Sequence, residues 1–275
     1  MIKVEDIVEA LKLAVTNLPE DVVLALKNAY EREEHEIAKY NLEIMLRAVE
    51  TSKKKKVPLC QDTGTPIFFV ETDGTWNVRE IYKTIFEAVK RATDEIPLRP
   101  NAISLLTGKA IGNIPEIHVE LGERNRISIL IKGGGSENCS ALYPLTPGDW
   151  FEGVKEKIIS HISSCGGKPC PPIIIGIGIA SPAEKAMILA KKSLLRKIGE
   201  RHEKLGWLEE EILEKVNSLS IGPMGLGGKT TALDVKIEVG ERHPASFIVG
   251  IAIQCWAHRR AFIEEKEDGE VMIWQ

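Results

Sequence analysis

The sequence has no strong excess of either charge, no long hydrophobic run and no Cys-x-x-Cys pair. Its 275 residues include 36 Lys and Arg against 40 Asp and Glu, which gives a net charge of -4. This balance argues against nucleic acid or a membrane surface as partner, because both attract clustered positive charge. No stretch reaches the roughly 18 uninterrupted apolar residues of a membrane span, and the first residues form no apolar signal core. We therefore expect a cytoplasmic globular protein that binds a small molecule or another protein.

No internal repeat or low-complexity linker divides the chain, and 43% hydrophobic residues suffice for a substantial core. Apolar residues in the first fifty positions recur at helical spacing, as in the stripe Leu42, Met45, Leu46 and Val49. A lysine run at 53–56 ends this segment, and a solvated linker is favoured over an anion or partner site. From residue 57 onward, short β-rich runs alternate with helical patterns. The pattern predicts a mixed α/β (α+β) fold in one domain: a helical segment over residues 1–56, then a mixed-sheet body over 57–275.

Several elements of this body can be placed individually. Short apolar and β-branched runs predict strands at 66–70, 117–121, 127–131, 173–179, 232–239 and 247–253. The runs at 173–179 and 247–253 are almost continuously apolar, which indicates burial on both faces. Four-residue spacing predicts a helix near 150–162. Ser181-Pro-Ala-Glu184 predicts a second helix that begins with a capping box and a proline at its first position.

Three of the five cysteines, Cys60, Cys170 and Cys255, lie far apart in unusual local sequences. In a reducing compartment, separated cysteines indicate metal ligands, reactive thiols or buried small side chains rather than disulfides. Three thiolates that bind a cubane of four irons would leave one iron open as a Lewis acid. A zinc site would need a fourth ligand, and zinc cysteines usually come in close pairs, whereas these are 110 and 85 residues apart.

Two polar, glycine-containing segments are candidates for the rest of a site. Cys60-Gln-Asp-Thr-Gly-Thr65 places a thiol, an amide, a carboxylate and hydroxyls before an apolar strand, although a hydrogen-bonded turn with a buried cysteine has the same composition. Lys132-Gly-Gly-Gly-Ser136 could turn its N–H groups into a nest for a carboxylate, or could be a flexible turn. Cys139, just beyond, is either a spare thiol or a packing residue.

Single residues add weaker signals. Arg99 lies between two prolines that stiffen its backbone, so its guanidinium is aimed at a carboxylate or is an ordinary surface group. His243 precedes an apolar strand twelve residues before Cys255 and is either functional or structural. The other candidate histidines fall on helical or charged stretches, so we expect them on the solvated surface: His161, His202 and His258.

The glycine-rich segment that ends in Lys229 and Thr230 is not a P-loop. A P-loop requires a glycine where Pro223 stands, and the following residues predict a strand rather than a helix. This segment lines an acid-binding site or simply turns.

Taken together, the motifs at 60–65, 132–136, 170–172 and 242–246 and the late cysteine resemble the class I, iron–sulfur fumarate hydratases and the related tartrate dehydratases. The similarity covers essentially the whole chain. It implies a hydro-lyase with a 4Fe–4S cluster bound by Cys60, Cys170 and Cys255.

The resemblance also implies roles for residues around this cluster. Gln61, Arg99, Gly134 and Gly135 would bind a small dicarboxylate substrate. Asp62 and His243 would be catalytic groups that relay protons. Cys139 and Cys165 match no ligand position.

Single-chain members of the family carry an additional C-terminal domain that completes the active site. This chain therefore resembles the alpha subunit of a two-subunit form, which implies a beta subunit and a hetero-oligomer with alpha–alpha contacts. The expected reaction is reversible hydration of fumarate to (S)-malate, a step of the tricarboxylic acid cycle. The alternatives are a tartrate dehydratase alpha subunit and, from another class, a non-catalytic metal or iron–sulfur scaffold.

Overall fold

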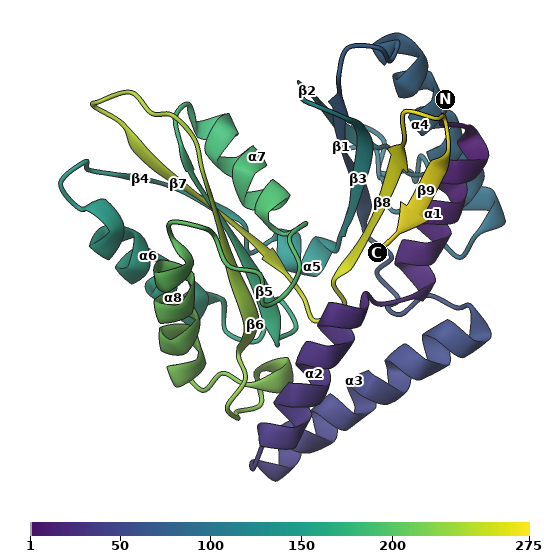
Figure 1. Cartoon of the computed structure of the whole chain (residues 1–275). Helices are drawn as coiled ribbons and strands as arrows, with labels where there is room; N and C mark the ends of the chain where they lie inside the picture. The colour runs from purple at the N-terminus through teal and green to yellow at the C-terminus, as the bar shows by residue number, and fades with distance from the viewer. Residues whose placement is uncertain (1) are drawn as a thin grey trace. The chain divides into compact units, whose positions relative to one another are not determined.

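The computed structural model describes residues 2–275, which form helices and two mixed β-sheets (Figure 1). By their contacts the residues divide into two compact units, each built from segments that are distant in sequence. The first unit comprises the chain up to Glu20, Ala48–Gly134 and Arg259–Gln275, and the second comprises Asp21–Arg47 and Gly135–His258. The expected mixed α/β fold with a helical N-terminal segment is confirmed. The single-domain division stays a prediction.

Three helices make up the N-terminal segment: α1 (Val4–Thr16), α2 (Glu20–Arg32) and α3 (Glu36–Lys55). The last turn of α3 carries lysines, which interact favourably with the negative end of the helix dipole. Ser52 in this helix donates from Oγ to the carbonyl of Thr16, at 2.8 Å, and so fixes α3 to the end of α1. No helix within residues 2–275 is both long enough and apolar enough to cross a membrane.

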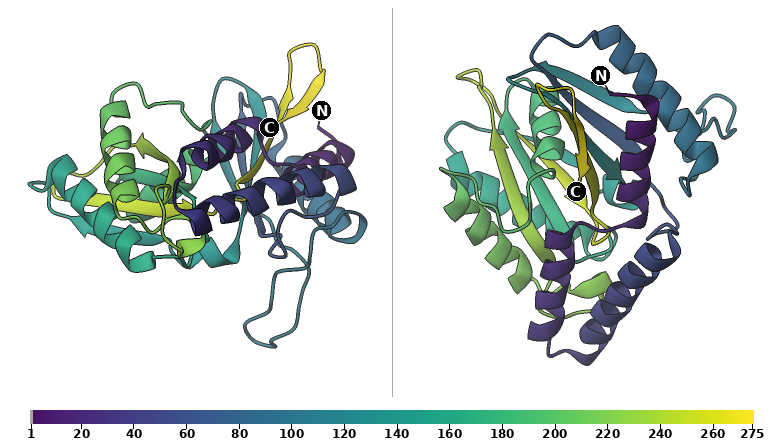
Figure 2. Two further views of the ribbon diagram at one scale, coloured as in Figure 1. Left: turned by 90° about the horizontal axis from the view of Figure 1, so that it is seen from below. Right: turned by 45° about the vertical axis from the view of Figure 1, so that its right-hand side comes forward.

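The first unit contains a five-stranded sheet covered by α1 and by α4 (Val78–Glu95) (Figure 2). Its strands are β1 (Thr65–Thr72), β2 (Glu116–Leu121), β3 (Asn125–Lys132), β8 (Arg259–Glu265) and β9 (Val271–Trp274). Their order is β2-β1-β3-β8-β9, with β1 and β2 parallel and the other neighbours antiparallel. Inward side chains such as Phe68 and Ile129 pack with Leu11 and Ile85 of the helices in one core. This core holds the N-terminal end of β1, where the motif at 60–65 ends, and the C-terminal end of β3, where the motif at 132–136 begins.

The second unit contains a four-stranded sheet with helices on both faces (Figure 1). Its strands are β4 (Ala141–Leu145), β5 (Ile173–Ala180), β6 (Ala232–Val239) and β7 (Phe247–Gln254), in the order β4-β7-β5-β6. Helix α7 (Ala183–Ser193) packs on one face, while α6 (Trp150–Cys165) and α8 (Gly206–Ser218) share a core with the other. Two short helices, α5 (Gly134–Glu137) and the 3-10 turn η1 (Pro223–Gly225), lie in the connections.

Strand β5 explains how α7 lies so close to the sheet. Its isoleucines alternate with Gly176 and Gly178, so one face carries large side chains and the other almost none. A Cβ atom at Gly178 would lie 2.0 Å from the carbonyl oxygen of Ala186, and one at Gly176 would lie 2.1 Å from that of Ala190. Every residue of the strand is buried, as its apolar sequence predicted.

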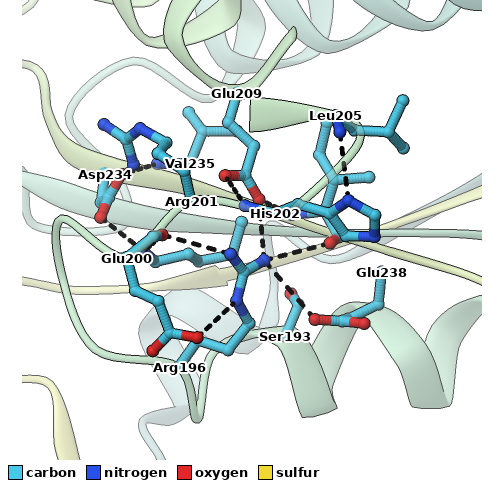
Figure 3. Close-up of polar contacts among 12 residues, drawn as sticks. Ser193, Arg196, Glu200, Arg201, His202, Leu205, Glu209, Asp234, Val235 and Glu238 are labelled. Atoms are coloured by element: carbon cyan, nitrogen blue, oxygen red, sulfur yellow. Dashed lines mark hydrogen bonds and ion pairs between the residues drawn. The ribbon is translucent and has the colours of Figure 1, made fainter. Parts of the chain in front are cut away.

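The connection between α7 and α8 is fixed by buried charges rather than by regular structure (Figure 3). Glu209 accepts hydrogen bonds from Arg196 Nη1, at 2.8 Å, and from the main-chain nitrogens of His202 and Ile237. Asp234 on β6 accepts from Arg201 Nη1, at 2.6 Å, and from the main chain of Gly199. Burying these carboxylates is tolerable because each is paired and hydrogen-bonded.

The strands and helices predicted individually all form, but two details of the predictions were wrong. Helix α7 begins at Ala183 with Pro182 as its N-cap, and no side chain caps it, so the predicted capping box is absent. His258 is fully buried, with Nε2 2.8 Å from the carbonyl oxygen of Leu194, rather than on the solvated surface. Its charged sequence neighbours misled the prediction because Arg259 and Arg260 are themselves buried.

Candidate functional site

The segment Cys60–Gly64 connects α3 to β1 in the first unit and has no regular structure. Cys60 is half-buried and its thiol is free. Thr63 is fully buried, and its Oγ1 accepts hydrogen bonds from Arg99 N and from Asn101 Nδ2, both at 3.0 Å. The segment is therefore an ordered turn held by side-chain hydrogen bonds, and its cysteine remains accessible.

Arg99 lies directly against this segment. Its Nη1 donates to the carbonyl oxygen of Gln61, at 3.3 Å, while its main-chain nitrogen binds Thr63. Asn113 donates from Nδ2 to the carbonyl of Arg99, at 2.8 Å, and its Oδ1 accepts from Asn101 N. The structure thus brings Gln61 and Arg99 together, and the exposed guanidinium keeps further donors for a carboxylate.

Asp62 links the segment to the glycine motif at the end of β3. Its Oδ1 accepts from Gly64 N at 2.9 Å, and its Oδ2 accepts from Gly134 N at 2.7 Å. The glycine motif does not form an open anion nest, because the chain enters α5 and the Gly134 N–H already binds a carboxylate of the protein. Gly135 follows with open space around its Cα.

Cys170 and Cys255 lie at the same end of two neighbouring central strands in the second unit's sheet. Cys170 precedes β5 and Cys255 follows its antiparallel neighbour β7, where Ile174 pairs with Gln254. The main-chain nitrogen of Trp256 donates to the carbonyl of Cys170, at 3.3 Å, so the two cysteine loops are hydrogen-bonded. Both thiols are half-buried and outside any disulfide.

The backbone at Cys170 is strained. Its φ of 56° lies in the left-handed region, which costs a non-glycine residue about 1–3 kcal/mol. Such a conformation persists only where the surroundings hold it, as the bonds from Trp256 and from Met224 N to the Pro171 carbonyl do here.

His243 lies at the opposite end of these strands, in the connection from β6 to β7. The eight residues of β7 separate it from Cys255, a span of about 27 Å for an extended strand. Its Nδ1 accepts from Ala245 N, at 3.1 Å, which stabilises the local turn. Within this unit the structure therefore does not bring His243 to the two cysteines.

The remaining cysteines belong to the core of the second unit. Cys139 and Cys165 are buried among Ile158, Ile162 and other apolar side chains. Burial, together with a hydrogen bond to the Cys139 thiol, raises the pKa of Cys165 to about 12. Its thiol stays protonated at neutral pH and is a poor ligand or nucleophile.

The donor chemistry around the three half-buried thiols fits an iron–sulfur cluster. Thiolates are the ligands of such clusters, and Cys165, whose raised pKa makes it a poor thiolate, lies in the core instead. Next to Cys60's segment, Arg259 is 1% exposed and donates from Nη1 to the carbonyl of Asp62, at 2.7 Å. Its buried Nε donates to no acceptor in residues 2–275, as expected of a group that binds an anion. Neither unit, within those residues, gathers three His, Cys, Asp or Glu side chains into a complete metal site by itself.

Sequence reasoning missed several residues of this framework: Thr63, Asn101, Asn113 and Arg259. Thr63 stands inside the recognised motif, but its hydroxyl gave no sign that it would accept two hydrogen bonds. The asparagines lie in an apolar loop, where only their capacity for main-chain hydrogen bonds could have indicated a role. Two consecutive arginines, Arg259 and Arg260, do not predict a buried strand.

The chain is similar to known proteins over nearly its whole length. Residues 4–264 match the family described as fumarate hydratase (Fumerase). A protein of Methanocaldococcus jannaschii, provisionally named L(+)-tartrate dehydratase subunit alpha, is 49% identical, and the alignment covers 98% of this chain and 100% of that relative. The L(+)-tartrate dehydratase subunit alpha of Escherichia coli strain UTI89 is 34% identical over 92% of this chain and 87% of its own length. That of strain K12 is 34% identical over 89% and 84%.

These matches span nearly all of the chain, including every motif described above. This chain therefore belongs to the fumarate hydratase (Fumerase) family of hydro-lyases.

Proposed function

We propose that this chain is the alpha subunit of a two-subunit iron–sulfur hydro-lyase that removes water from L(+)-tartrate. The observation that carries the proposal is the hydrogen-bonded framework of Cys60–Gly64, Arg99 and Gly134, which places a free thiol, an amide, a carboxylate and a guanidinium together. The substrate is taken from relatives that align over most of both lengths and are named for tartrate.

Fumarate, the substrate expected from the sequence motifs, is the second candidate. The description of the matched family favours it, and a place in the tricarboxylic acid cycle belongs to this alternative. The names of the relatives favour tartrate, so we rank fumarate second. Both diacids present two carboxylates and a carbon that gains or loses a hydroxyl group.

Cys60, Cys170 and Cys255 are the proposed ligands of a 4Fe–4S cluster. When bound, this group supplies Lewis acidity for departure of the substrate hydroxyl, a poor leaving group without such help. The half-buried position of all three thiols supports the assignment, because a ligand must be reachable by the incoming metal.

The chain's own polar groups would hold and orient the diacid. The guanidinium of Arg99 is exposed and can bind a carboxylate with two parallel N–H donors. Gln61, also exposed, and the main-chain N–H groups at Gly134 and Gly135 are the proposed partners of the second carboxylate, Gly134 by exchanging its bond to Asp62. Fixing both ends of the substrate places the reacting carbons and removes much of the entropic cost of the reaction.

Asp62 and His243 are the proposed proton-transfer groups. Asp62 accepts main-chain N–H bonds with both oxygens, which holds its carboxylate in one orientation beside Gly134. His243 lies at the opposite end of the strands from Cys170 and Cys255, so its proposed role does not depend on proximity to those thiols.

A beta subunit and a hetero-oligomer with alpha–alpha contacts complete the proposal, together with a cytoplasmic location. The support for a partner is that the relatives matched over most of their length are named as alpha subunits. The base that removes the carbon-bound proton is assigned to that partner.

The test is anaerobic co-expression with the beta subunit, followed by steady-state kinetics on L(+)-tartrate, malate and fumarate. We expect the highest kcat/KM on L(+)-tartrate and loss of activity in air. Higher kcat/KM on malate or fumarate would reverse the ranking of the substrates. Bound iron and sulfide without turnover of any diacid would instead support a non-catalytic scaffold.

The ligand assignment is tested by Cys170→Ser, with Cys139→Ala as the matched control. After reconstitution, we expect Cys170→Ser to lose cluster absorbance and activity while Cys139→Ala keeps both. Full retention of the cluster in Cys170→Ser would refute the assignment.

A further inference from the structure

Arg259 is a cation whose side chain is almost completely buried. It is the first residue of β8, pairs with Ile131 of β3 in the sheet register, and is 1% exposed. Its Nη1 binds the main-chain carbonyl of Asp62, at 2.7 Å, rather than a carboxylate. A carbonyl does not neutralise a guanidinium, and an uncompensated buried charge is costly.

The buried Nε of Arg259 strengthens this conclusion. It donates to no acceptor among residues 2–275, whereas buried donors in folded proteins nearly always find one. Folding removes water from this N–H group without giving it another acceptor. This is expected where an acceptor binds after folding. An acceptor that also neutralises the guanidinium in such a dry environment is an anion.

A second buried cation lies close by. Lys132, 2% exposed, ends β3 and pairs in register with Thr65, the first residue of β1. Gly64 packs so tightly on this lysine that an added Cβ would lie 2.9 Å from its carbonyl oxygen. Two buried cationic side chains thus lie on the strands next to the segment that carries Cys60, Gln61 and Asp62.

We infer that Arg259 is a positioning residue of the candidate site, which fixes the Cys60–Asp62 segment through the Asp62 carbonyl and offers its buried Nε–H to an anion held by that segment. This inference rests on the proposed function. The anion has two possible sources with the same chemistry: the negatively charged, thiolate-bound cluster and a carboxylate of the diacid.

The test compares Arg259→Gln, which removes the charge, with Arg259→Lys, which keeps the charge but loses the guanidinium fork. The matched control is Arg126→Gln, on the same sheet, because Arg126 binds Glu264 on the neighbouring strand and not the Cys60 segment. Three quantities are measured: iron and sulfide retained per chain during dialysis against a chelator, KM and kcat for L(+)-tartrate with the beta subunit, and the melting temperature of the cluster-free chain.

For Arg259→Gln we expect either faster cluster loss or a KM raised about tenfold or more, with partial rescue in Arg259→Lys and neither effect in Arg126→Gln. Faster cluster loss with unchanged KM identifies the cluster as the anion. A raised KM with normal cluster retention identifies the substrate carboxylate.

Two results would overturn the inference. One is a lower melting temperature with wild-type cluster retention and wild-type KM. The other is failure of both Arg259 variants to fold, which would make the residue purely structural. A wild-type chain that binds no cluster and turns over no diacid contradicts the proposed function itself, and this outcome is read before any variant is compared.

Discussion

At the scale of single residues, the candidate site is built largely from bonds between side chains and main chain. Thr63, Asp62 and Arg99 each fix a neighbouring stretch of backbone, and the groups proposed for substrate binding remain exposed beside them. Such bonds make the site rigid without consuming its functional atoms. Glycine is required at one point in this framework, and its replacement has a defined consequence.

Gly64→Ala should destabilise the chain by about 2–3 kcal/mol, because the new Cβ would meet the Lys132 carbonyl and the residue's φ is +82°. The matched control is Gly74→Ala, where φ is +94° but no atom lies within 4 Å. It should cost only about 1 kcal/mol, from backbone strain alone. Urea unfolding of the two variants measures the difference, and equal losses would show that the predicted clash is relieved in solution.

The cysteines should differ in reactivity. In the cluster-free chain at pH 8, we expect iodoacetamide to label Cys60, Cys170 and Cys255 and to spare Cys165, because burial raises the pKa of the Cys165 thiol to about 12. Peptide mass spectrometry of the time course measures this, and denaturant should abolish the difference. Early labelling of Cys165 in the folded chain would contradict its placement in the core.

The same shift has a consequence for stability. Cys165's folded pKa lies above the ordinary value of 9.0, so its contribution is constant below that pH and is lost as the pH rises toward 12. The unfolded thiol ionises in this window, whereas the folded thiol does not.

At the scale of elements, pairs of layers fit because small residues and charges occur at particular positions. Alternation of isoleucine and glycine in β5 fills the α6 and α8 face and leaves the other face flat for α7. The connection that follows α7 depends on ion pairs. A long irregular connection can be this ordered only if its polar groups have buried partners.

Glu209→Ala should lower the free energy of unfolding by about 3–5 kcal/mol, because it leaves Arg196 and two main-chain N–H groups without their shared acceptor. The neighbouring Glu210→Ala is the control: its ion pair with Arg201 is exposed on the carboxylate side, so its loss should cost less than about 1 kcal/mol. Chemical denaturation compares them. A small loss for Glu209→Ala would mean that water replaces its bonds.

At the scale of the whole molecule, each of the two units has its own sheet and its own core. The first unit carries Cys60 with Gln61, Asp62, Arg99 and Gly134, and the second carries Cys170 and Cys255. Residues 100–115 form a further feature of the first unit, a hairpin-like loop with bonds between Ala102 and Gly112 and between Ser104 and Lys109 (Figure 2).

Leu105 and Leu106 in this loop are fully exposed. Replacing both by serine should change the free energy of unfolding by less than about 0.5 kcal/mol, since no contact is lost. Leu98→Ala, at a position 2% exposed just before the loop, should instead cost about 2–5 kcal/mol. A large loss in the double serine variant would show that these leucines are packed in solution.

Much of the fold could be predicted from local pattern. The strands at 173–179 and 247–253 follow from nearly continuous apolar runs, and α6 follows from four-residue spacing. Strands β8 and β9 were not predicted, because charged residues such as Arg259 and Glu264 conceal the alternation of the apolar ones. The interleaving of the units, with α2 and part of α3 assigned to the second, has no local signature at all.

The sequence by itself determined the family, the mixed α/β class and the candidate residues, because cysteine, glycine and proline motifs record chemistry and backbone geometry locally. Only the tertiary structure decided that Asp62 binds Gly134 and that Arg259 is buried beside Asp62. It also decided that Cys170 and Cys255 lie at the same end of neighbouring strands, with His243 at the opposite end. These relations depend on strand order and register, which arise from packing between residues far apart in the chain.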